Sequence, residues 1–351
     1  MSNTIIGWDI GGAHLKAAQI NVDGGVDRVF QEPCPLWLGL DQLEGALDRI
    51  LGAIISGPVL HAITMTGELA DHFSSREQGV LALTMAMVRR LGAGCVKVFA
   101  GQDGFIPAER LQLADTRQVA SANWLASGLW SASRMQEGLF IDIGSTTTDL
   151  LPISDHAVAN RGYTDSERMG YDELLYSGVT RTPAMMLAKR VPLEGGWARV
   201  MAEVFASAAD VYRLTGELHE YVDQMPAADH GPKTIEGSQR RLARQFGWDA
   251  DDLPARGWQE LAGYLRERQL MALRDAAEIQ LSRGLLGAAA PLIGAGIGRF
   301  LVRVLAERLQ RDYVDFSELF VMSPKGGDFD IADCGPATAV GCLAHKEAGG
   351  G

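Results

Sequence analysis

The most informative segment of the chain is Phe140-Ile-Asp-Ile-Gly-Ser-Thr-Thr-Thr-Asp-Leu150. An apolar run carries Asp142 into a turn of glycine, serine and threonine, and Asp149 follows seven residues later. Glycine lets the backbone approach a ligand closely, while turn amides and hydroxyl groups donate hydrogen bonds to phosphate oxygens. Two carboxylates beside such a turn suit Mg²⁺ or its bound waters. The stretch therefore predicts a hairpin that binds phosphate through Gly144, Ser145, Thr146, Thr147 and Thr148.

The chain uses the same pattern once before. The segment Asp9-Ile-Gly-Gly-Ala-His-Leu-Lys16 also follows an apolar run, and Lys16 stands where Asp149 stands in the second copy. A single copy is equally well explained by a tight hairpin whose threonine hydroxyls cap their own backbone. Two copies favour a pair of hairpins that grip one polyphosphate from opposite sides. The first copy would contribute Asp9, Gly11, Gly12 and Lys16.

The composition is that of an ordinary globular protein, with 351 residues of which 47% are hydrophobic and 22% are charged. The formal net charge of -12 argues against nonspecific binding to nucleic acid or to an anionic membrane, because both need a basic face. No apolar stretch reaches the length of a membrane span, and no basic and apolar leader opens the chain. The cysteines include no Cys-x-x-Cys pair, which favours a reduced compartment. We expect a soluble cytoplasmic protein without nucleic-acid or membrane partners.

Turn residues and periodicity predict two α/β domains. The first domain, residues 1–136, opens with a three-stranded meander over 4–29 and ends in a linking helix over 118–136. The second domain, residues 137–351, opens in the same way with a hairpin over 139–153. The repeated opening is the main reason to divide the chain here.

The rest of the second domain is predicted to be mainly helical. Helical periods dominate a predicted insertion at about 184–288. A strand is expected at 319–322. A C-terminal helix at about 336–346 begins with proline in its first turn, and we expect it to pack back near the first domain.

A late glycine turn stands in Pro291-Leu-Ile-Gly-Ala-Gly-Ile-Gly298, where a short strand opens a helix. Its spacing differs from the dinucleotide fingerprint Gly-x-Gly-x-x-Gly, and too little chain follows to build a doubly wound half. Two interpretations stay open. Gly294, Gly296 and Gly298 receive an adenosine or similar group, or they allow a helix start to pack closely against a sheet.

Glu68, Asp71 and His72 follow a buried strand at 60–65. Reactive groups are often found beyond strand ends in α/β proteins. A polar loop that caps the next helix would use the same residue types. They are candidates for a general base, with the capping loop as the alternative.

Basic residues gather near the middle of the chain, at Lys233, Arg241 and Arg244. They suit a diphosphate or a substrate carboxylate. A solvated helix face is the alternative interpretation, and it is the commoner use of such residues.

Two matching hairpins and a late glycine turn resemble the superfamily of acetate and sugar kinases, heat-shock chaperones and actin. The matching segments are Asp9 to Lys16, Phe140 to Leu150, Ile293 to Gly298 and the connecting helix Gly335 to Ala344. The resemblance spans the whole chain. It implies two ribonuclease-H-like domains, of the actin-like ATPase kind, with mixed sheets around a central cleft.

Within that superfamily, the second hairpin and Gly178-Val-Thr-Arg-Thr-Pro183 resemble the hydantoinase/oxoprolinase branch. A narrower resemblance is to proteins of the tetrahydromethanopterin-linked one-carbon pathway, which include the aryl-ether synthase of methylofuran biosynthesis. The residues that carry it are Met65 to Phe73, Ala228 to Thr234 and Arg241 to Arg244.

The narrower resemblance implies a transferase that joins an aminomethylfuran methyl diphosphate to the phenol of glutamyltyramine or a relative, forming an aryl ether and releasing pyrophosphate. Its partners would be these two small molecules, and ATP is allowed but not required. Mg²⁺ would be held through Asp9, Asp142 or Asp149. The phenol would lose its proton to Asp71, Glu68 or His72, and further substrate or nucleotide contacts would come from Gly294, Gly296, Gly298, Arg181 and Lys233.

Two other functions remain open from the sequence. One is an ATP-dependent kinase or hydrolase of the hydantoinase/oxoprolinase kind that uses the same aspartates. The other is a nucleotide-gated binding protein without net chemistry. The sequence does not distinguish ATP from an organic diphosphate, and it does not decide the oligomeric state.

Overall fold

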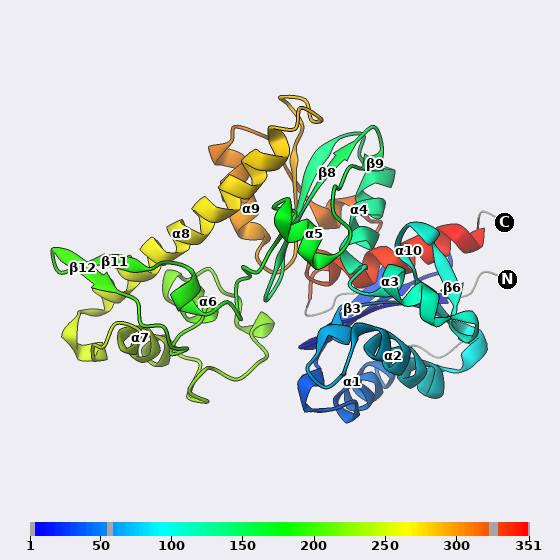
Figure 1. Cartoon of the computed structure of the whole chain (residues 1–351), viewed down its shortest axis with the longest axis horizontal. Coiled ribbons are helices and arrows are strands. Elements are labelled where there is room, and N and C mark those ends of the chain that lie inside the picture. Colours follow the sequence, from blue (N-terminus) through cyan, green and yellow to red (C-terminus); the bar gives the residue numbers. More distant parts are fainter. Residues whose placement is uncertain (1–3, 55–58, 323–328, 350–351) are drawn as a thin grey trace. The chain divides into compact units, whose positions relative to one another are not determined.

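The computed structural model describes residues 4–54, 59–322 and 329–349 (Figure 1). The chain forms two compact units. The first consists of Met1–Glu137, Ile153–Ala159 and Asp315–Gly351, and the second of Gly138–Pro152 and Asn160–Val314.

The first unit is built on a mixed sheet of six strands in the order β3-β2-β1-β4-β5-β6. The first three strands are antiparallel neighbours, which confirms the predicted meander. β4 then runs parallel to β1, and β5 parallel to β4. The strands are β1 (Thr4–Ile10), β2 (His14–Ile20), β3 (Val26–Pro33), β4 (Val59–Met65), β5 (Val96–Phe99) and β6 (Phe105–Pro107).

Helices α1 (Asp41–Leu51) and α2 (Arg76–Leu91) share a buried apolar cluster with every second residue of β1, Ile6, Trp8 and Ile10. The remaining residues of β1 point to the other face, because side chains alternate along a strand. On that face α10 (Gly335–Gly349) packs against β1, and α4 (Asn123–Arg134) packs against α10. The helix predicted at about 336–346 is α10.

The contact between α10 and β1 is unusually close. A methyl group added at Gly7 would overlap the carbonyl oxygen of Ala337, and one added at Gly341 would lie 3.2 Å from the Gly7 backbone. The two glycines therefore let helix backbone rest on strand backbone. The face of β1 that carries Asp9 is covered in this way for most of its length.

The predicted linking helix over 118–136 is wrong in its first part. The chain forms a short helix α3 (Thr116–Val119), breaks, and starts again as α4. The break falls at Ser121, whose φ of 51° lies in the left-handed region. Its hydroxyl donates a hydrogen bond of 2.7 Å to Glu68 Oε1. This long-range bond explains a break that local periodicity does not indicate.

The second sheet has the order β10-β8-β7-β13-β14, and β9 also pairs with β8. β7 and β8 form the predicted hairpin, and β13 runs parallel to β7. Apolar residues of α8 (Ala255–Leu281) and α9 (Arg299–Arg308) share a buried cluster with β7. The strands are β7 (Gly138–Ile143), β8 (Thr148–Ser154), β9 (Ala157–Val158), β10 (Leu174–Leu175), β13 (Leu292–Ala295) and β14 (Tyr313–Asp315).

The insertion predicted at about 184–288 contains α6 (Ala208–Thr215), α7 (Ile235–Arg244) and the long helix α8 (Figure 1). It also contains a two-stranded antiparallel sheet of β11 (Arg190–Leu193) and β12 (Gly196–Arg199) that periodicity did not predict. A further short helix, α5 (Asp165–Gly170), precedes it.

The predicted strand at 319–322 is wrong. Residues Phe316–Leu319 form a 3₁₀ turn, and Met322 makes only an isolated bridge with Val26. The turn brings Phe316 edge-on to Phe320, and Phe320 stacks on Trp130 with ring centroids 5.1 Å apart. Aromatic packing on α4 thus replaces strand pairing here.

Among the described residues, no helix combines the length and the apolar character that crossing a membrane requires.

Candidate functional site

The turn between β7 and β8 is closed by a hydrogen bond of 2.9 Å from the Gly144 amide to the Thr147 carbonyl. In the described part of the chain, the amides of Ser145, Thr146 and Thr147 make no hydrogen bond of their own. These three residues are only partly buried. Adjacent backbone N–H groups in a turn form a concave anion-binding site. The turn therefore presents donors in the arrangement that the sequence predicts for phosphate.

The segment 177–182 supports this turn from behind. Val179 N donates to Gly144 O at 3.1 Å, and Arg181 N donates to Ser145 O at 2.8 Å. The Thr148 hydroxyl in turn donates to the Ser177 carbonyl at 2.6 Å. Gly178 touches the turn so closely that an added methyl group would overlap the Ser145 and Thr146 backbone. The motif at 178–183 is thus a structural partner of the second hairpin.

Arg181 brings a positive charge to the same turn. Its Nη1 donates to the Thr146 hydroxyl at 3.3 Å. Burial lowers the pKa of the Arg181 guanidinium from its ordinary value, but an arginine stays charged at neutral pH. A planar guanidinium beside turn amides is a suitable partner for a phosphate group. The substrate contact predicted for Arg181 stays a prediction, and its position supports it.

The glycine turn after β13 lies against Asp142. Ala295 is the strand partner of Asp142, and Gly296, with φ of 78°, approaches it so closely that an added methyl group would overlap Asp142 Oδ1. Gly298 N donates to Ile143 O at 2.9 Å. The structure therefore brings the predicted third motif to the end of β7, beside the second hairpin.

Close packing accounts for each of the three glycines in that turn. A methyl group at Gly294 would lie 2.6 Å from Tyr313 Cε2, and one at Gly298 would lie 2.5 Å from Ile143 Cγ2. The packing interpretation is therefore sufficient for their residue type. A contact with adenosine stays a prediction.

Asp149 is paired with an arginine that the sequence analysis missed. Arg168 is 1% exposed, and its Nη2 lies 2.8 Å from Asp149 Oδ1. Burial raises the pKa of the Asp149 carboxyl, and Arg168 opposes that rise. Because a guanidinium already occupies this carboxylate, a metal ion would compete with it. Arg168 stands in a polar connector without any periodic pattern, so no local signal identifies it.

The first hairpin places Asp9 opposite Lys16 in the pairing of β1 with β2. Lys16 Nζ donates to the Asp333 carbonyl at 2.7 Å, another partner that the sequence did not indicate. Gly11 N donates to His14 O at 3.0 Å. Asp9 and Lys16 belong to the first compact unit, and Asp142 and Asp149 to the second. The joint grip of the two hairpins on one ligand stays a prediction.

The three candidate bases differ in exposure. Glu68 is 1% exposed and accepts the hydrogen bond from Ser121, so its contacts favour a supporting role. Asp71 and His72 are exposed in the loop that follows. Their role as general base stays a prediction.

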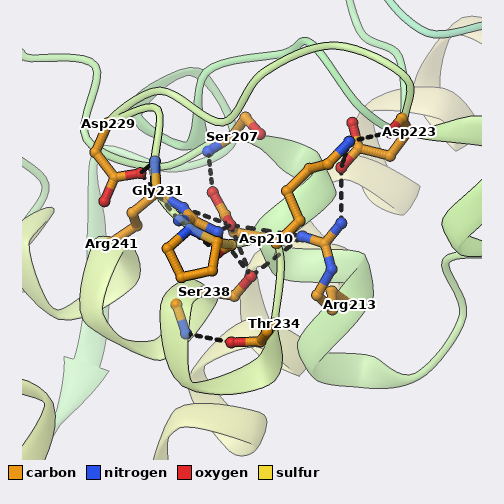
Figure 2. A network of polar contacts seen from close by, with 12 residues as sticks. Ser207, Asp210, Arg213, Asp223, Asp229, Gly231, Thr234, Ser238 and Arg241 are labelled. Carbon is orange, nitrogen blue, oxygen red and sulfur yellow. Dashed lines mark hydrogen bonds and ion pairs between the residues drawn. The ribbon is translucent and has the colours of Figure 1, made fainter.

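Arg241 belongs to an internal network of the insertion (Figure 2), and Lys233 joins it through Asp223. Arg241 is 1% exposed and contacts Asp210 at 2.7 Å and Asp229 at 3.0 Å. Lys233 Nζ donates to the carbonyls of Asp223 and Met225. These contacts disfavour the substrate role predicted for Lys233. Arg244 is exposed on α7.

A surface pocket of about 600 Å³ lies beside α6 and α8. Its lining includes the ion pair of Glu217 with Arg266, whose closest atoms are 2.7 Å apart. None of the predicted site residues lines it.

No group of three or more histidine, cysteine, aspartate or glutamate side chains within residues 4–54, 59–322 and 329–349 could hold a metal ion. Mg²⁺ commonly uses only one or two carboxylates together with substrate phosphates and water. Asp9 and Asp142 fit that mode of binding as single carboxylates. Asp149 fits it less well because of Arg168.

Comparison with known proteins gives three findings. Residues 60–316 match the hydantoinase/oxoprolinase family. A protein of Methanocaldococcus jannaschii named (4-{4-[2-(gamma-L-glutamylamino)ethyl]phenoxymethyl}furan-2-yl)methanamine synthase is 26% identical over 349 residues, which cover 99% of each chain. The synthase of the same name from Methanococcus vannielii is 34% identical over 210 residues, covering 60% of this chain and 91% of that one.

Among solved structures, nucleotide-free acetone carboxylase is similar with a TM-score of 0.59 and 11% identity, covering 98% of this chain and 70% of that one. At that identity the likeness concerns the fold alone. The predicted fold class, a mixed α/β fold of the actin-like ATPase kind, is confirmed.

Both curated relatives are synthases, and this chain is an enzyme. The family match covers well over half of the sequence and includes the second hairpin, the supporting segment and the glycine turn. The chain belongs to the hydantoinase/oxoprolinase family.

Proposed function

We propose that this enzyme is a transferase that forms an aryl ether from an aminomethylfuran methyl diphosphate and the phenol of glutamyltyramine, releasing pyrophosphate. The observation that carries the proposal is the match over 99% of both chains to a synthase whose name describes a phenoxymethyl furan with a glutamylaminoethyl group. The reaction would take place in the cytoplasm, in keeping with the cysteine pattern.

The reaction is a displacement at the methyl carbon attached to furan. The phenol oxygen forms a bond to that carbon, and the bond from carbon to the diphosphate oxygen breaks with its electron pair. Charge therefore develops on the leaving pyrophosphate. Fixed donors that meet such charge lower the barrier most effectively. The amides of the 145–147 turn and the Arg181 guanidinium are the donors that this chain offers.

The phenol must also lose its proton. A phenol with a pKa near 10 is mostly neutral at pH 7, so a nearby base would assist attack. The exposed side chains Asp71 and His72 are our candidates for that base. Mg²⁺, held by Asp142 or Asp9, would neutralise part of the diphosphate charge.

An ATP-dependent kinase or hydrolase of the same family is the second candidate. The observation in its favour is that the turn at Gly296 lies against Asp142 and beside the phosphate turn. A nucleotide would then place its phosphates on the turn and its adenosine on the glycines.

The test is to incubate the purified enzyme with both organic substrates and Mg²⁺, with and without ATP. We expect the ether, detected by mass spectrometry, and an equal amount of pyrophosphate in both reactions. Ether formation that requires ATP, or hydrolysis of ATP in the reaction that contains it, would favour the second candidate. Nucleotide binding without any turnover would indicate a binding protein, and absence of ether in every reaction would contradict the transferase.

Gly144→Ala should separate folding from ligand binding. An added methyl group would lie 3.6 Å from the Thr147 carbonyl, which is an ordinary contact. We expect the free energy of unfolding to change by less than about 0.5 kcal/mol. Affinity for pyrophosphate, measured by titration calorimetry, should fall about tenfold, because the methyl group intrudes where backbone meets phosphate.

The matched control is Gly170→Ala, at the end of α5, where an added methyl group would meet no atom within 4 Å. It should leave binding unchanged and should not lower stability, because alanine favours a helix over glycine. Unchanged pyrophosphate affinity in Gly144→Ala would argue against the turn as the phosphate site.

A further inference from the structure

One side chain of the insertion reaches the segment behind the phosphate turn. Gln269, on α8, is 1% exposed. Its Nε2 donates to Ser177 Oγ and to the Gly178 carbonyl, each at 3.0 Å. Its Oε1 accepts a hydrogen bond of 2.7 Å from the Tyr212 hydroxyl. Both ends of the buried amide are therefore engaged.

The Gly178 carbonyl and the Tyr212 hydroxyl together fix how that amide is oriented. Its ring is fully buried on α6, and burial raises the pKa of its hydroxyl, so the hydroxyl remains a donor at neutral pH. A hydroxyl can donate or accept, but the Gly178 carbonyl can only accept, so the nitrogen of Gln269 must face that carbonyl. The Tyr212 hydroxyl then donates to the amide oxygen and holds this orientation.

The segment 177–182 approaches the phosphate turn most closely at Gly178. Gly178 lies on the Ser145 and Thr146 backbone without room for a methyl group, and the next residues donate to the carbonyls of Gly144 and Ser145. A displacement of Gly178 would therefore displace the turn. Two backbone bonds from α6 hold the far end of the segment: Ala208 N to Thr182 O at 2.7 Å and Ala209 N to Thr180 O at 3.2 Å.

We infer that Gln269, oriented by Tyr212, is a positioning residue: it fixes the segment 177–182 so that the amides of the 145–147 turn converge on a diphosphate. The inference rests on the proposed role of the turn as the diphosphate site. The helical insertion then has a role in the reaction, because α6 and α8 fix the geometry of the turn without contacting the diphosphate themselves.

The chemistry of the amide makes the inference specific. Gln269→Glu keeps an acceptor for Tyr212 and for the Ser177 hydroxyl but cannot donate to the Gly178 carbonyl when ionised. Gln269→Met keeps the length and removes all three hydrogen bonds. Tyr212→Phe removes only the orienting hydroxyl.

The test compares Gln269→Met with Gln280→Met. Gln280 lies on the same helix, is fully buried, and donates to the Tyr171 carbonyl at 2.7 Å, away from the segment 177–182. Each variant loses a buried amide, so both should lower the unfolding midpoint to a similar extent. Only Gln269→Met should weaken pyrophosphate binding, by about tenfold, with a smaller loss in Tyr212→Phe and Gln269→Glu.

Hydrogen exchange without ligand supplies the second readout. In Gln269→Met the peptides that cover 144–148 and 177–182 should exchange faster than in the wild type, whereas Gln280→Met should leave them unchanged. Equal exchange in the two variants, or equal loss of pyrophosphate affinity, would overturn the positioning role. A wild-type enzyme that binds no pyrophosphate would instead contradict the proposed function, and the exchange comparison would still decide the role of Gln269.

Discussion

Gly178→Ala should lose the phosphate turn. We expect the free energy of unfolding to fall by about 3 kcal/mol, at the upper end of what overpacking costs, and pyrophosphate binding to become undetectable. The added methyl group would overlap backbone atoms of Ser145 and Thr146, and backbone cannot move aside as a side chain can. Hydrogen bonds on both sides of Gly178 also prevent the segment from withdrawing without further loss.

Urea unfolding and titration calorimetry would measure the two effects. The comparison with Gly144→Ala is informative, because the glycine of the turn itself tolerates a methyl group sterically, whereas Gly178 does not. A Gly178→Ala enzyme with normal stability and normal binding would show that the segment 177–182 does not determine the shape of the turn.

Arg168→Met, on α5, should strongly destabilise the second unit. It would leave Asp149 largely buried without the guanidinium that now lies 2.8 Å away. Removing one partner of a buried ion pair costs about 3–5 kcal/mol. Arg168 also donates to the Glu173 carbonyl at 3.0 Å, and that carbonyl would then keep its backbone bond from Leu150 N at 2.9 Å. Urea unfolding at neutral pH would measure the loss.

The loss in Arg168→Met should depend on pH. Burial already raises the pKa of Asp149, and Arg168 opposes the rise, so the pKa should rise further in the variant. A carboxyl with a higher pKa in the folded state binds its proton more readily when folded, and stability then increases as the pH falls. The difference between wild type and variant should therefore shrink between about pH 7 and pH 5.

Two further variants test whether the buried charge of Asp149 causes the loss of stability. Adding Asp149→Asn to Arg168→Met removes the buried charge and should restore part of the lost stability. Arg256→Met, in an exposed pair with Glu260, should change the free energy of unfolding by less than about 1 kcal/mol. A loss in Arg168→Met that is independent of pH, and equal with and without Asp149→Asn, would show that lost packing rather than the charge is responsible.

Local patterns were sufficient to predict both hairpins. The alternation around Asp9 and around Asp142, with glycine in each turn, depends on residues that are neighbours in sequence. For the same reason the strand and helix flanking Gly294 to Gly298 were predictable. Contacts between distant segments were not. The break at Ser121 follows from its bond to Glu68, and the turn at Phe316 follows from packing on Trp130.

The residues that support the candidate site were also not predictable, because their contacts join distant segments of the chain. Gly178, Arg168 and Gln269 act on the second hairpin from positions far along the chain, and each is an ordinary residue in its local context. By contrast, the basic character of Lys233 and Arg241 suits a phosphate or carboxylate ligand, yet their charges meet acceptors within the insertion. A single sequence does not indicate which charges are satisfied internally.

The contact of α10 with β1 has a consequence for how the protein is made on the ribosome. Gly7 and Gly341 stand near opposite ends of the sequence, yet their backbones touch. While the chain emerges, β1 leaves the ribosome before the second unit, and α10 leaves it afterwards. One face of the sheet in the first unit therefore remains uncovered while the second unit is synthesised. Apolar surface exposed during that period promotes aggregation. Folding of the first unit is thus completed only after synthesis of the second.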